Sequence, residues 1–261
     1  MRGWWREIAG LVLPVACGGC GSPRTPLCAP CARALHGSAA SRVRPAPEPA
    51  GLPAVHAAAP YADSVRAVLL AHKERGVLGL AGPLGFALAG AVRAAAGPSA
   101  APGAPPLLLV PVPSSRRAVR ARGHDPTRRI ALAAAARLRT TGRAARVVPV
   151  LRQGRAVADQ SALTARARLA NMAGALEVVP GGERLLREGP VVLVDDLMTT
   201  GATLAEAARA LSAVHGSFTA GFTRTGAAVV AAVPRSFEIN RNCRGTRIVA
   251  GDERGKPPLR R

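Results

Sequence analysis

Short apolar runs alternate with amphipathic stretches along most of the chain, and this alternation indicates its architecture. Strands are expected at 55–61, 107–112, 147–151, 176–179, 190–194 and 217–223. Helices are expected at 65–73, 78–95, 127–138 and 202–214. The basic stretches at 113–126 and 152–171 predict loops. Strands that alternate with helices favour an α/β fold with a parallel, doubly wound sheet.

The distribution of residue types divides the chain into four parts. Residues 1–35 form a cysteine-rich module, and the Pro-, Ala-, Ser- and Arg-rich residues 36–53 predict a linker. The α/β domain occupies 54–234. The Arg-rich residues 235–261 lack apolar periodicity and predict a flexible tail. A chain of 261 residues is long enough for one such domain and a small accessory module.

The formal net charge of +21 comes almost entirely from arginine, since Lys73 and Lys256 are the only lysines. Such a charge attracts polyanions, including DNA, RNA and diphosphates. A genome rich in G and C would equally enrich Ala, Arg, Gly and Pro together. The charge therefore permits a nucleic-acid partner without identifying one. The scarcity of aromatic residues argues against modules that stack single-stranded bases.

The N-terminus superficially resembles a signal peptide, because Arg2 and Arg6 precede the apolar residues 8–16. The adjacent Glu7, the short apolar run and Pro14 argue against that interpretation. No stretch is expected to span a bilayer without interruption. We therefore expect a soluble, cytoplasmic protein.

Two acidic residues, Asp195 and Asp196, end the apolar run 190–194. In open α/β sheets, ligands bind beyond the carboxyl ends of strands. The small and hydroxylated residues that follow are Thr199, Thr200, Gly201, Ala202 and Thr203. Such a loop, opening a helix, offers backbone N–H groups and hydroxyls to a phosphate. The arrangement predicts a phosphate in the loop and sugar hydroxyls on the carboxylates; the alternative is an ordinary capped turn. A Walker A loop is excluded because no Gly-Lys-Ser/Thr is present.

Two CxxC pairs, Cys17 with Cys20 and Cys28 with Cys31, lie close together near the N-terminus. Four thiolates on two such turns suit tetrahedral Zn²⁺ in a closed, structural site. Neighbouring glycines suit the turns. A pair of disulfides or a redox CxxC are the alternatives, and the expected lack of a signal peptide weighs against the first.

Residues 194–203 resemble the signature of type I phosphoribosyltransferases. Further stretches resemble the ComF-like, or GntX-type, branch of that family, which is associated with DNA uptake and use. They are the strand and diphosphate loop at 109–114, Arg-Gly-His-Asp at 122–125 in place of Arg-Gly-Phe-Asn, the segment 160–175 and His-Lys-Glu-Arg-Gly at 72–76.

The resemblance implies a phosphoribosyltransferase-like sheet preceded by a small zinc ribbon. It places Asp195 and Asp196 on the ribose of 5-phosphoribosyl diphosphate as catalytic residues, and Thr199 to Thr203 on the 5′-phosphate. Candidates for the diphosphate loop are Ser114, Ser115, Arg116, Arg117 and Arg122. Candidates for a flexible loop that closes over the ligand are Arg155, Gln160 and Arg168. Lys73 is a further candidate, and Mg²⁺ would accompany the diphosphate.

The sequence thus predicts a glycosyltransferase that moves phosphoribose to a nitrogenous acceptor. The alternative is a non-catalytic protein that senses the same ligand while its zinc ribbon and arginines engage DNA or a protein of the uptake machinery. The zinc ribbon could also dock a second copy of the chain. The sequence leaves the acceptor, and the choice between these functions, open.

Overall fold

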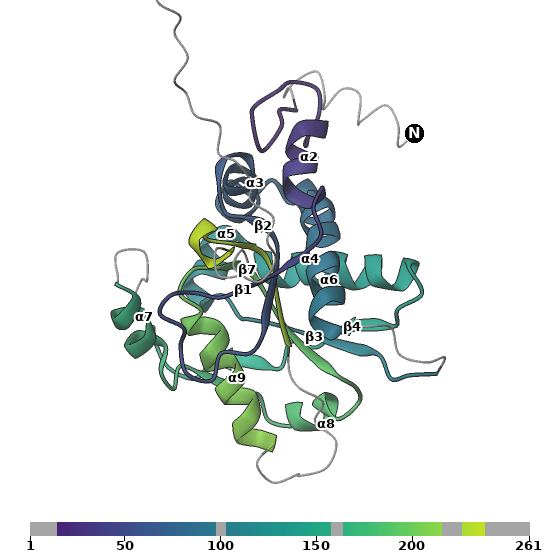
Figure 1. Cartoon of the computed structure of the whole chain (residues 1–261). Coiled ribbons are helices and arrows are strands. Elements are labelled where there is room, and N and C mark those ends of the chain that lie inside the picture. Colours follow the sequence, from purple (N-terminus) through teal and green to yellow (C-terminus); the bar gives the residue numbers. More distant parts are fainter. Residues whose placement is uncertain (1–14, 98–102, 158–163, 216–225, 238–261) are drawn as a thin grey trace, which may run out of the picture.

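The computed structural model describes residues 15–97, 103–157, 164–215 and 226–237 (Figure 1). Gln160, Cys243 and the tail beyond residue 237 lie outside these ranges, as do residues 217–223, where a closing strand was expected. The last described strand instead covers Gly226–Ala232, and all of its residues are buried.

A six-stranded sheet forms the centre of the molecule, in the order β1-β2-β8-β7-β3-β4. Its strands are β1 (Ser41–Val43), β2 (Val55–Pro60), β3 (Leu107–Pro111), β4 (Ala145–Val147), β7 (Val191–Met198) and β8 (Gly226–Ala232). The edge strand β1 is antiparallel to β2, and the remaining neighbours are parallel. A separate antiparallel pair joins β5 (Leu151–Gln153) to β6 (Leu176–Val178). The predicted α/β class with a mostly parallel sheet is therefore confirmed.

Helices cover both faces of the sheet (Figure 1). The described helices are α2 (Ala29–His36), α3 (Asp63–Lys73), α4 (Ala81–Ala96), α5 (Arg116–Arg122), α6 (Pro126–Thr140), α7 (Ala165–Met172), α8 (Gly182–Leu186) and α9 (Ala202–His215), with a 3₁₀ turn at Leu78–Leu80. Alternate strand residues face opposite cores. Leu109 and Val192 pack with α3, α4 and α6. Leu108 and Leu193 pack with α9 and the β5–β6 pair.

Two helices occupy stretches that were predicted as loops. Ser115 begins α5 by accepting a hydrogen bond from the Ala118 amide at 3.1 Å, and Gly123, with φ of 74°, ends it. Thr164 likewise begins α7 by accepting from the Ala167 amide at 3.3 Å. Both helices are rich in arginine and short of buried side chains, so they lack the apolar stripe by which helices are recognised.

The predicted strand at 147–151 is in fact the end of β4, a turn and the start of β5. Pro149 cannot donate a ladder hydrogen bond. Across it, the Val150 amide donates to the Val148 carbonyl at 2.9 Å. The chain therefore leaves the main sheet after Val147 and enters the smaller one at Leu151.

The segment predicted as a linker, 36–53, contributes to the sheet. Ser41 to Val43 pair with β2 in an antiparallel register. The Arg44 amide also donates to the Ser236 carbonyl at 2.9 Å. Leu35, at the end of the cysteine module, is fully buried in the same core as Val65 and Leu84. The module and the α/β domain consequently share one core.

Within the part of the chain that the structure describes, one stretch, Leu78–Ala96, is long and apolar enough to cross a membrane by length and composition alone. A single stretch of this kind is weak evidence for a membrane span. The stretch supplies Leu84, Leu88 and Val92 to the core beside the sheet. Core helices of globular domains pass the same test.

Candidate functional site

Asp195 and Asp196 lie where the sheet opens at the end of β7. Pairing between β3 and β7 ends at Pro111 with Val194, whereas pairing between β7 and β8 continues to Met198 with Ala232. From β3 the chain moves outward to β4, and from β7 it moves in the opposite direction to β8. Ligands in open α/β sheets bind at such a reversal of strand order, beyond the carboxyl ends. The two acids lie within the strand, because β7 continues to Met198, four residues beyond the predicted strand end at Val194.

The two carboxylates have different partners. Asp196 is 4% exposed, and its Oδ2 lies 2.7 Å from Lys73 Nζ. Asp195 Oδ1 accepts from the Asp196 amide at 2.8 Å and from Thr127 Oγ1 at 3.4 Å. Burial, followed by the neighbouring Asp196, raises the pKa of Asp195 well above its usual range, and Lys73 opposes this. Lys73 is therefore the countercharge of a crowded acidic pair.

The predicted phosphate loop joins β7 to the start of α9. Gly201 has φ of 77°, a conformation that L side chains rarely adopt, and its carbonyl accepts from the Ala205 amide at 2.9 Å. An added Cβ there would lie 3.1 Å from both Leu52 methyl carbons. The loop is thus packed against the 36–53 segment. Thr199, Thr200 and Thr203 remain partly exposed.

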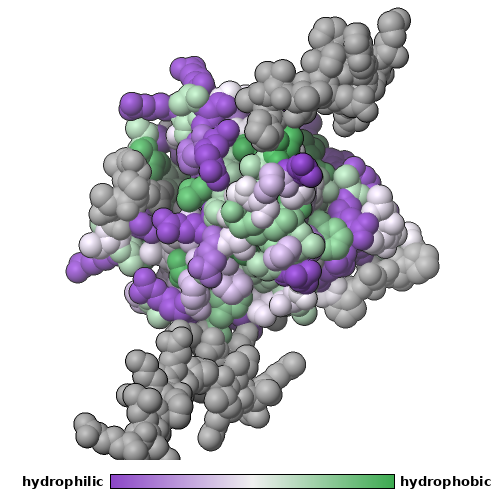
Figure 2. Space-filling model, turned by 90° about the horizontal axis from the view of Figure 1, so that it is seen from above, coloured by the Kyte–Doolittle hydropathy of each residue, from purple (hydrophilic) through white to green (hydrophobic). Residues whose placement is uncertain are grey.

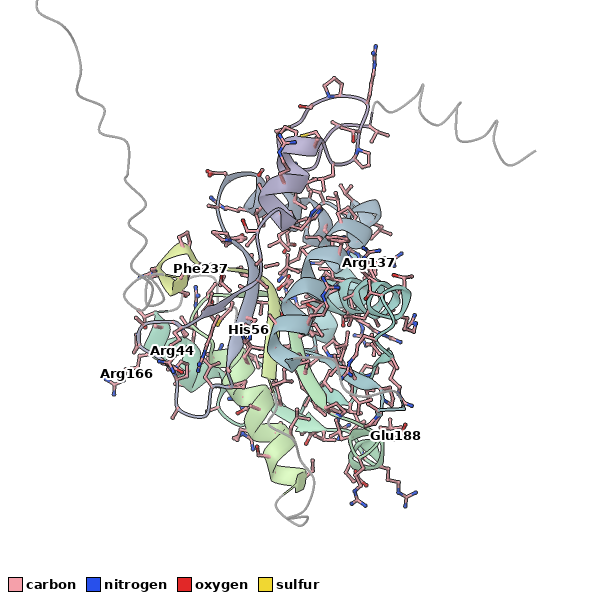
Figure 3. All side chains as sticks on the ribbon, turned by 45° about the vertical axis from the view of Figure 1, so that its right-hand side comes forward. Arg44, His56, Arg137, Arg166, Glu188 and Phe237 are labelled. Atoms are coloured by element: carbon pink, nitrogen blue, oxygen red, sulfur yellow. The ribbon has the colours of Figure 1, made fainter. Side chains whose placement is uncertain are left out.

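Of the flexible-loop candidates, Arg168 reaches the phosphate loop. Its Nη1 donates to Thr199 Oγ1 at 3.1 Å. Arg155 instead donates from Nη2 to the backbone carbonyls of Asn171 at 2.9 Å and Ala173 at 2.6 Å. These contacts tie its loop to the end of α7. Arg166, also on α7, points outward into solvent (Figure 3).

The candidates for the diphosphate loop have different structural surroundings. Ser115 caps α5, and Arg122 donates from Nε and Nη2 to the two oxygens of Glu74 at 2.9 and 2.7 Å. Ser114 is half-buried just beyond β3. Arg116 and Arg117 are exposed on α5. The arginines of α5 thus lie on the segment that follows the carboxyl end of β3, next to β7 in the sheet.

Two motifs distant in sequence, at 72–76 and 122–125, meet beside the acidic pair. In addition to the Arg122–Glu74 pair, His124 Nε2 lies 3.3 Å from the His72 carbonyl, and the two histidine rings are 5.7 Å apart. His124 Nδ1 lies 3.1 Å from the Arg122 carbonyl. Both nitrogens of His124 thus face backbone carbonyls, and the ring bridges α3 to the turn after α5.

Sequence reasoning missed Glu74 and Thr127 as neighbours of the site. Thr127 lies in the first turn of α6, where a threonine is ordinarily explained as a helix-starting residue. Glu74 immediately follows Lys73 in a stretch already compared with the ComF-like branch. Its place beside Lys73 in that stretch is the sequence feature that could have identified Glu74 as a neighbour of the site.

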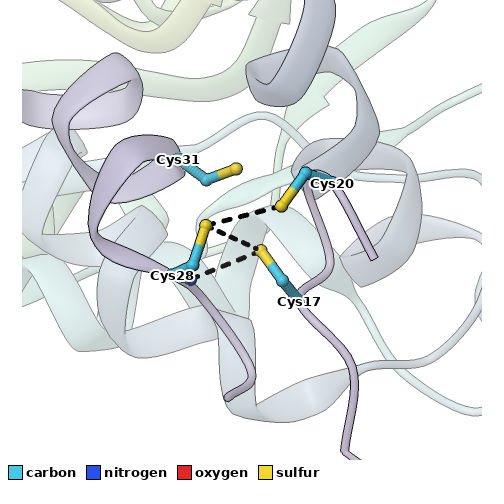
Figure 4. Close-up of side chains that lie close together, drawn as sticks. All are labelled: Cys17, Cys20, Cys28 and Cys31. Atoms are coloured by element: carbon cyan, nitrogen blue, oxygen red, sulfur yellow. Dashed lines mark hydrogen bonds between the residues drawn. The ribbon is translucent and has the colours of Figure 1, made fainter. Parts of the chain in front are cut away.

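The four predicted metal ligands lie together, with all sulfurs within 4.8 Å of one another (Figure 4). Cys28 Sγ is 3.6 Å from Cys17 Sγ and 3.5 Å from Cys20 Sγ, too far for disulfides. The first pair lies in a turn closed by the Gly21 amide on the Cys17 carbonyl at 2.9 Å. The second pair begins α2, with Cys28 at its N-cap. The prediction that these cysteines could bind a metal ion is confirmed.

The acidities of the thiols fit a cation at the centre of this cluster. Burial raises the pKa of Cys17, but backbone hydrogen bonds from Cys28, Cys20 and Gly19 outweigh it and lower that pKa to about 6. Burial and the three other cysteines raise the pKa of Cys31 to about 12. Thiolates this crowded repel one another, so all four ionise together only around a positive ion.

A hollow of about 300 Å³ lies elsewhere, between residues 36–40 and α4. Its lining includes His36, Phe86 and Arg93 and contains no carboxylate. Seen from above, the molecule carries hydrophilic side chains that are spread around the surface with apolar ones between them (Figure 2). Neither feature marks a site comparable to the acidic pair.

Models of protein families do not match this chain, and a search of curated proteins finds no significant match. The function of the chain is therefore inferred from its residues and their geometry.

Proposed function

We propose that the chain binds 5-phosphoribosyl diphosphate at the end of β7 and transfers its phosphoribose to a nitrogenous acceptor. The observation that carries this proposal is the position of the acidic pair. Asp195 and Asp196 lie where β3 stops pairing with β7, and a Thr- and Gly-rich loop leads from them directly into α9.

The proposed roles follow from the chemistry of each group. Carboxylates accept hydrogen bonds from ribose hydroxyls, and charge-assisted bonds of this kind are the stronger ones. The amides at the start of α9 and the hydroxyls of Thr199, Thr200 and Thr203 suit a phosphate monoester. Arg168, already on Thr199, would add positive charge at the same place.

The leaving diphosphate would be met by cations on the neighbouring segment after β3. Arg116 and Arg117 are exposed there, and Arg122 would exchange Glu74 for a diphosphate oxygen. Such cations stabilise the charge that grows on a departing diphosphate. Mg²⁺ prefers oxygen ligands and would be held mainly by the diphosphate itself. The acidic pair supplies the protein oxygens nearest to the proposed ribose.

We further propose Zn²⁺ as the metal of the four-cysteine cluster. Four thiolates in a compact, tetrahedral arrangement are typical of structural zinc, and they leave no open coordination position for catalysis. The cluster would hold the N-terminal module in place. Metal analysis of the purified protein tests this, with about one zinc per chain expected.

The transferase is tested in two stages. Isothermal titration calorimetry with 5-phosphoribosyl diphosphate and Mg²⁺ measures binding, and a panel of purine and pyrimidine bases then tests for diphosphate release. Ribose 5-phosphate, which lacks the diphosphate, is the control ligand. Release with one base supports the transferase. Tight binding without release favours a ligand-sensing protein, whose DNA affinity would then be measured with and without ligand. No binding contradicts both.

A further inference from the structure

Lys73 links the acidic site to a second part of the molecule. It is the last residue of α3, and of the two lysines in the chain only this one lies in the described residues. Its ammonium contacts Asp196 at 2.7 Å, while the next residue, Glu74, holds Arg122. The position of α3 therefore decides where two charged groups beside the acidic pair are placed.

The opposite side of α3 faces the four-cysteine cluster. Gly18 and Gly19 lie between Cys17 and Cys20. Arg75 Nη2 donates to the Gly18 carbonyl at 3.5 Å and to the Ala67 carbonyl at 3.3 Å. Ala67 and Ala71 lie one helical turn apart, so they share a face of α3. The cysteine turn thus contacts the same helix that carries Lys73.

The two glycines between the first cysteines are needed for this close approach rather than for backbone conformation. Positive φ occurs at Gly21 but not at Gly18 or Gly19. An added Cβ at Gly18 would lie 2.7 Å from Leu80 Cδ1 and 3.4 Å from Ala71 Cβ. At Gly19 it would lie 2.7 Å from Cys31 Sγ and 3.3 Å from Ser64 Cβ. The turn of the first CxxC is therefore packed against Ser64 and Ala71 of α3 and against Leu80 in the turn that follows α3.

We propose that metal binding by the four cysteines positions Lys73 on Asp196 by holding the Gly18–Gly19 turn against α3. Lys73 is then a positioning residue for the acidic pair, and Gly18 and Gly19 transmit the state of the cluster to it. The contacts run from Cys17 and Cys20 through the turn to α3, and from the end of α3 to Asp196. The inference goes beyond the proposed function, because it holds whatever ligand the acidic pair binds.

The buried face of α3 provides the competing explanation. Val65, Val68 and Leu69 are buried against the core and would hold the helix without any help from the cysteines. If these contacts are sufficient, the state of the metal will not change the surroundings of Lys73. The experiment must therefore observe Lys73 directly while the metal or the turn is altered.

The two-lysine composition makes this measurement practicable. In full-length protein labelled with ¹⁵N-lysine, Lys73 and Lys256 give the two side-chain ammonium signals, and Lys256→Arg identifies the second. The Asp196→Asn variant gives a reference signal for Lys73 without its charged partner. We expect removal of zinc by a chelator to move the Lys73 signal toward that reference. Hydrogen exchange of the ammonium should accelerate about tenfold, as expected for loss of one charge-assisted hydrogen bond.

Gly18→Ala tests the same coupling with all four cysteines intact. We expect it to retain about one zinc per chain and to move the Lys73 signal in the same direction. Gly79→Ala is the matched control, since an added Cβ there meets no atom within 4 Å. An unchanged Lys73 signal in folded Gly18→Ala protein would overturn the proposal, even if the zinc-free parent proved too unstable to measure. None of these measurements contains 5-phosphoribosyl diphosphate, so failure to bind that ligand would not mimic failure here.

Discussion

Asp195 and Asp196 are adjacent in sequence but lie in different electrostatic surroundings. Asp196 has Lys73 as a direct partner, whereas Asp195 accepts from Thr127 and from the Asp196 amide. Burial and then Asp196 raise the pKa of Asp195. Between its unfolded and folded pKa values the folded chain binds more protons, so stability falls as pH rises through that window. The ionised acidic pair therefore costs stability, as is common for functional groups.

Replacing Asp195 should consequently stabilise the protein at neutral pH. Asp195→Asn keeps an oxygen that can accept from Thr127 and removes the charge that burial and Asp196 disfavour. We expect a higher midpoint of thermal unfolding than the parent at pH 7, with the difference disappearing as pH falls toward about 4, the usual pKa of an aspartate. Circular dichroism across this pH range measures it. Glu188→Gln, which alters an exposed ion pair, is the control. A lower midpoint for Asp195→Asn at pH 7 would contradict this account.

Replacing Asp196 should instead weaken ligand binding. Asp196→Asn removes charge from the oxygen proposed to accept a ribose hydroxyl. Hydrogen bonds to charged groups contribute roughly 1.5–3 kcal/mol, so affinity for 5-phosphoribosyl diphosphate should fall about tenfold or more. Calorimetry provides the comparison, again with Glu188→Gln as control. Equal affinity in a folded Asp196→Asn variant removes this residue from the site.

The acidic pair and the cysteine ligands were evident from sequence because their residues are local clusters. The contact between Lys73 and Asp196 was not, because it joins positions 123 residues apart. Spacing within one segment carries no information on such a pair. The same limit applies to Thr127 and Asp195, and to Arg122 and Glu74.

At the scale of elements, prediction succeeded where burial imposes a pattern. The strands β2, β3 and β7 are apolar because both faces of the sheet are covered, so they were visible as short apolar runs. Helices α5 and α7 were missed because their formation depends on capping and on arginine's helix propensity, with little burial. One of these missed helices carries Arg168 to the phosphate loop.

Helix α7 permits a matched test of that contact. Arg168→Gln removes the charge that lies on Thr199, whereas Arg166→Gln removes an exposed charge from the same helix. A hydrogen bond contributes roughly 0.5–1.5 kcal/mol, and up to about 3 when one partner is charged. We therefore expect Arg168→Gln to weaken binding of 5-phosphoribosyl diphosphate roughly three- to tenfold more than Arg166→Gln does. If both variants weaken it equally, the general positive charge of α7 matters and the Thr199 contact does not.

At the scale of the whole molecule, the composition of the chain predicted a separate module, linker and domain, whereas the structure packs them together. Residues 36–53 have the composition of a linker, yet β1 pairs with β2 and Leu52 packs on the phosphate loop. A strand of three residues is too short to show alternation of apolar and polar positions. One buried leucine, Leu35, likewise gives no periodic pattern, although its burial joins the cysteine module to the core of the α/β domain.

Because the cysteine module and the α/β domain share one core, we expect them to unfold together. Leu35, near the end of α2, is fully buried in the core that includes Val65 and Leu84. Leu35→Ala leaves a cavity there and should lower the free energy of unfolding by about 2–5 kcal/mol, whereas Leu185→Ala, at a side chain 38% exposed, should cost much less. Calorimetry with a zinc indicator follows both parts at once. We expect a single transition in each protein, with zinc released at the same, lowered temperature in Leu35→Ala. Release of zinc well below a main transition that stays at the parent's temperature would show instead that the module melts separately, as its linker-like connection predicts.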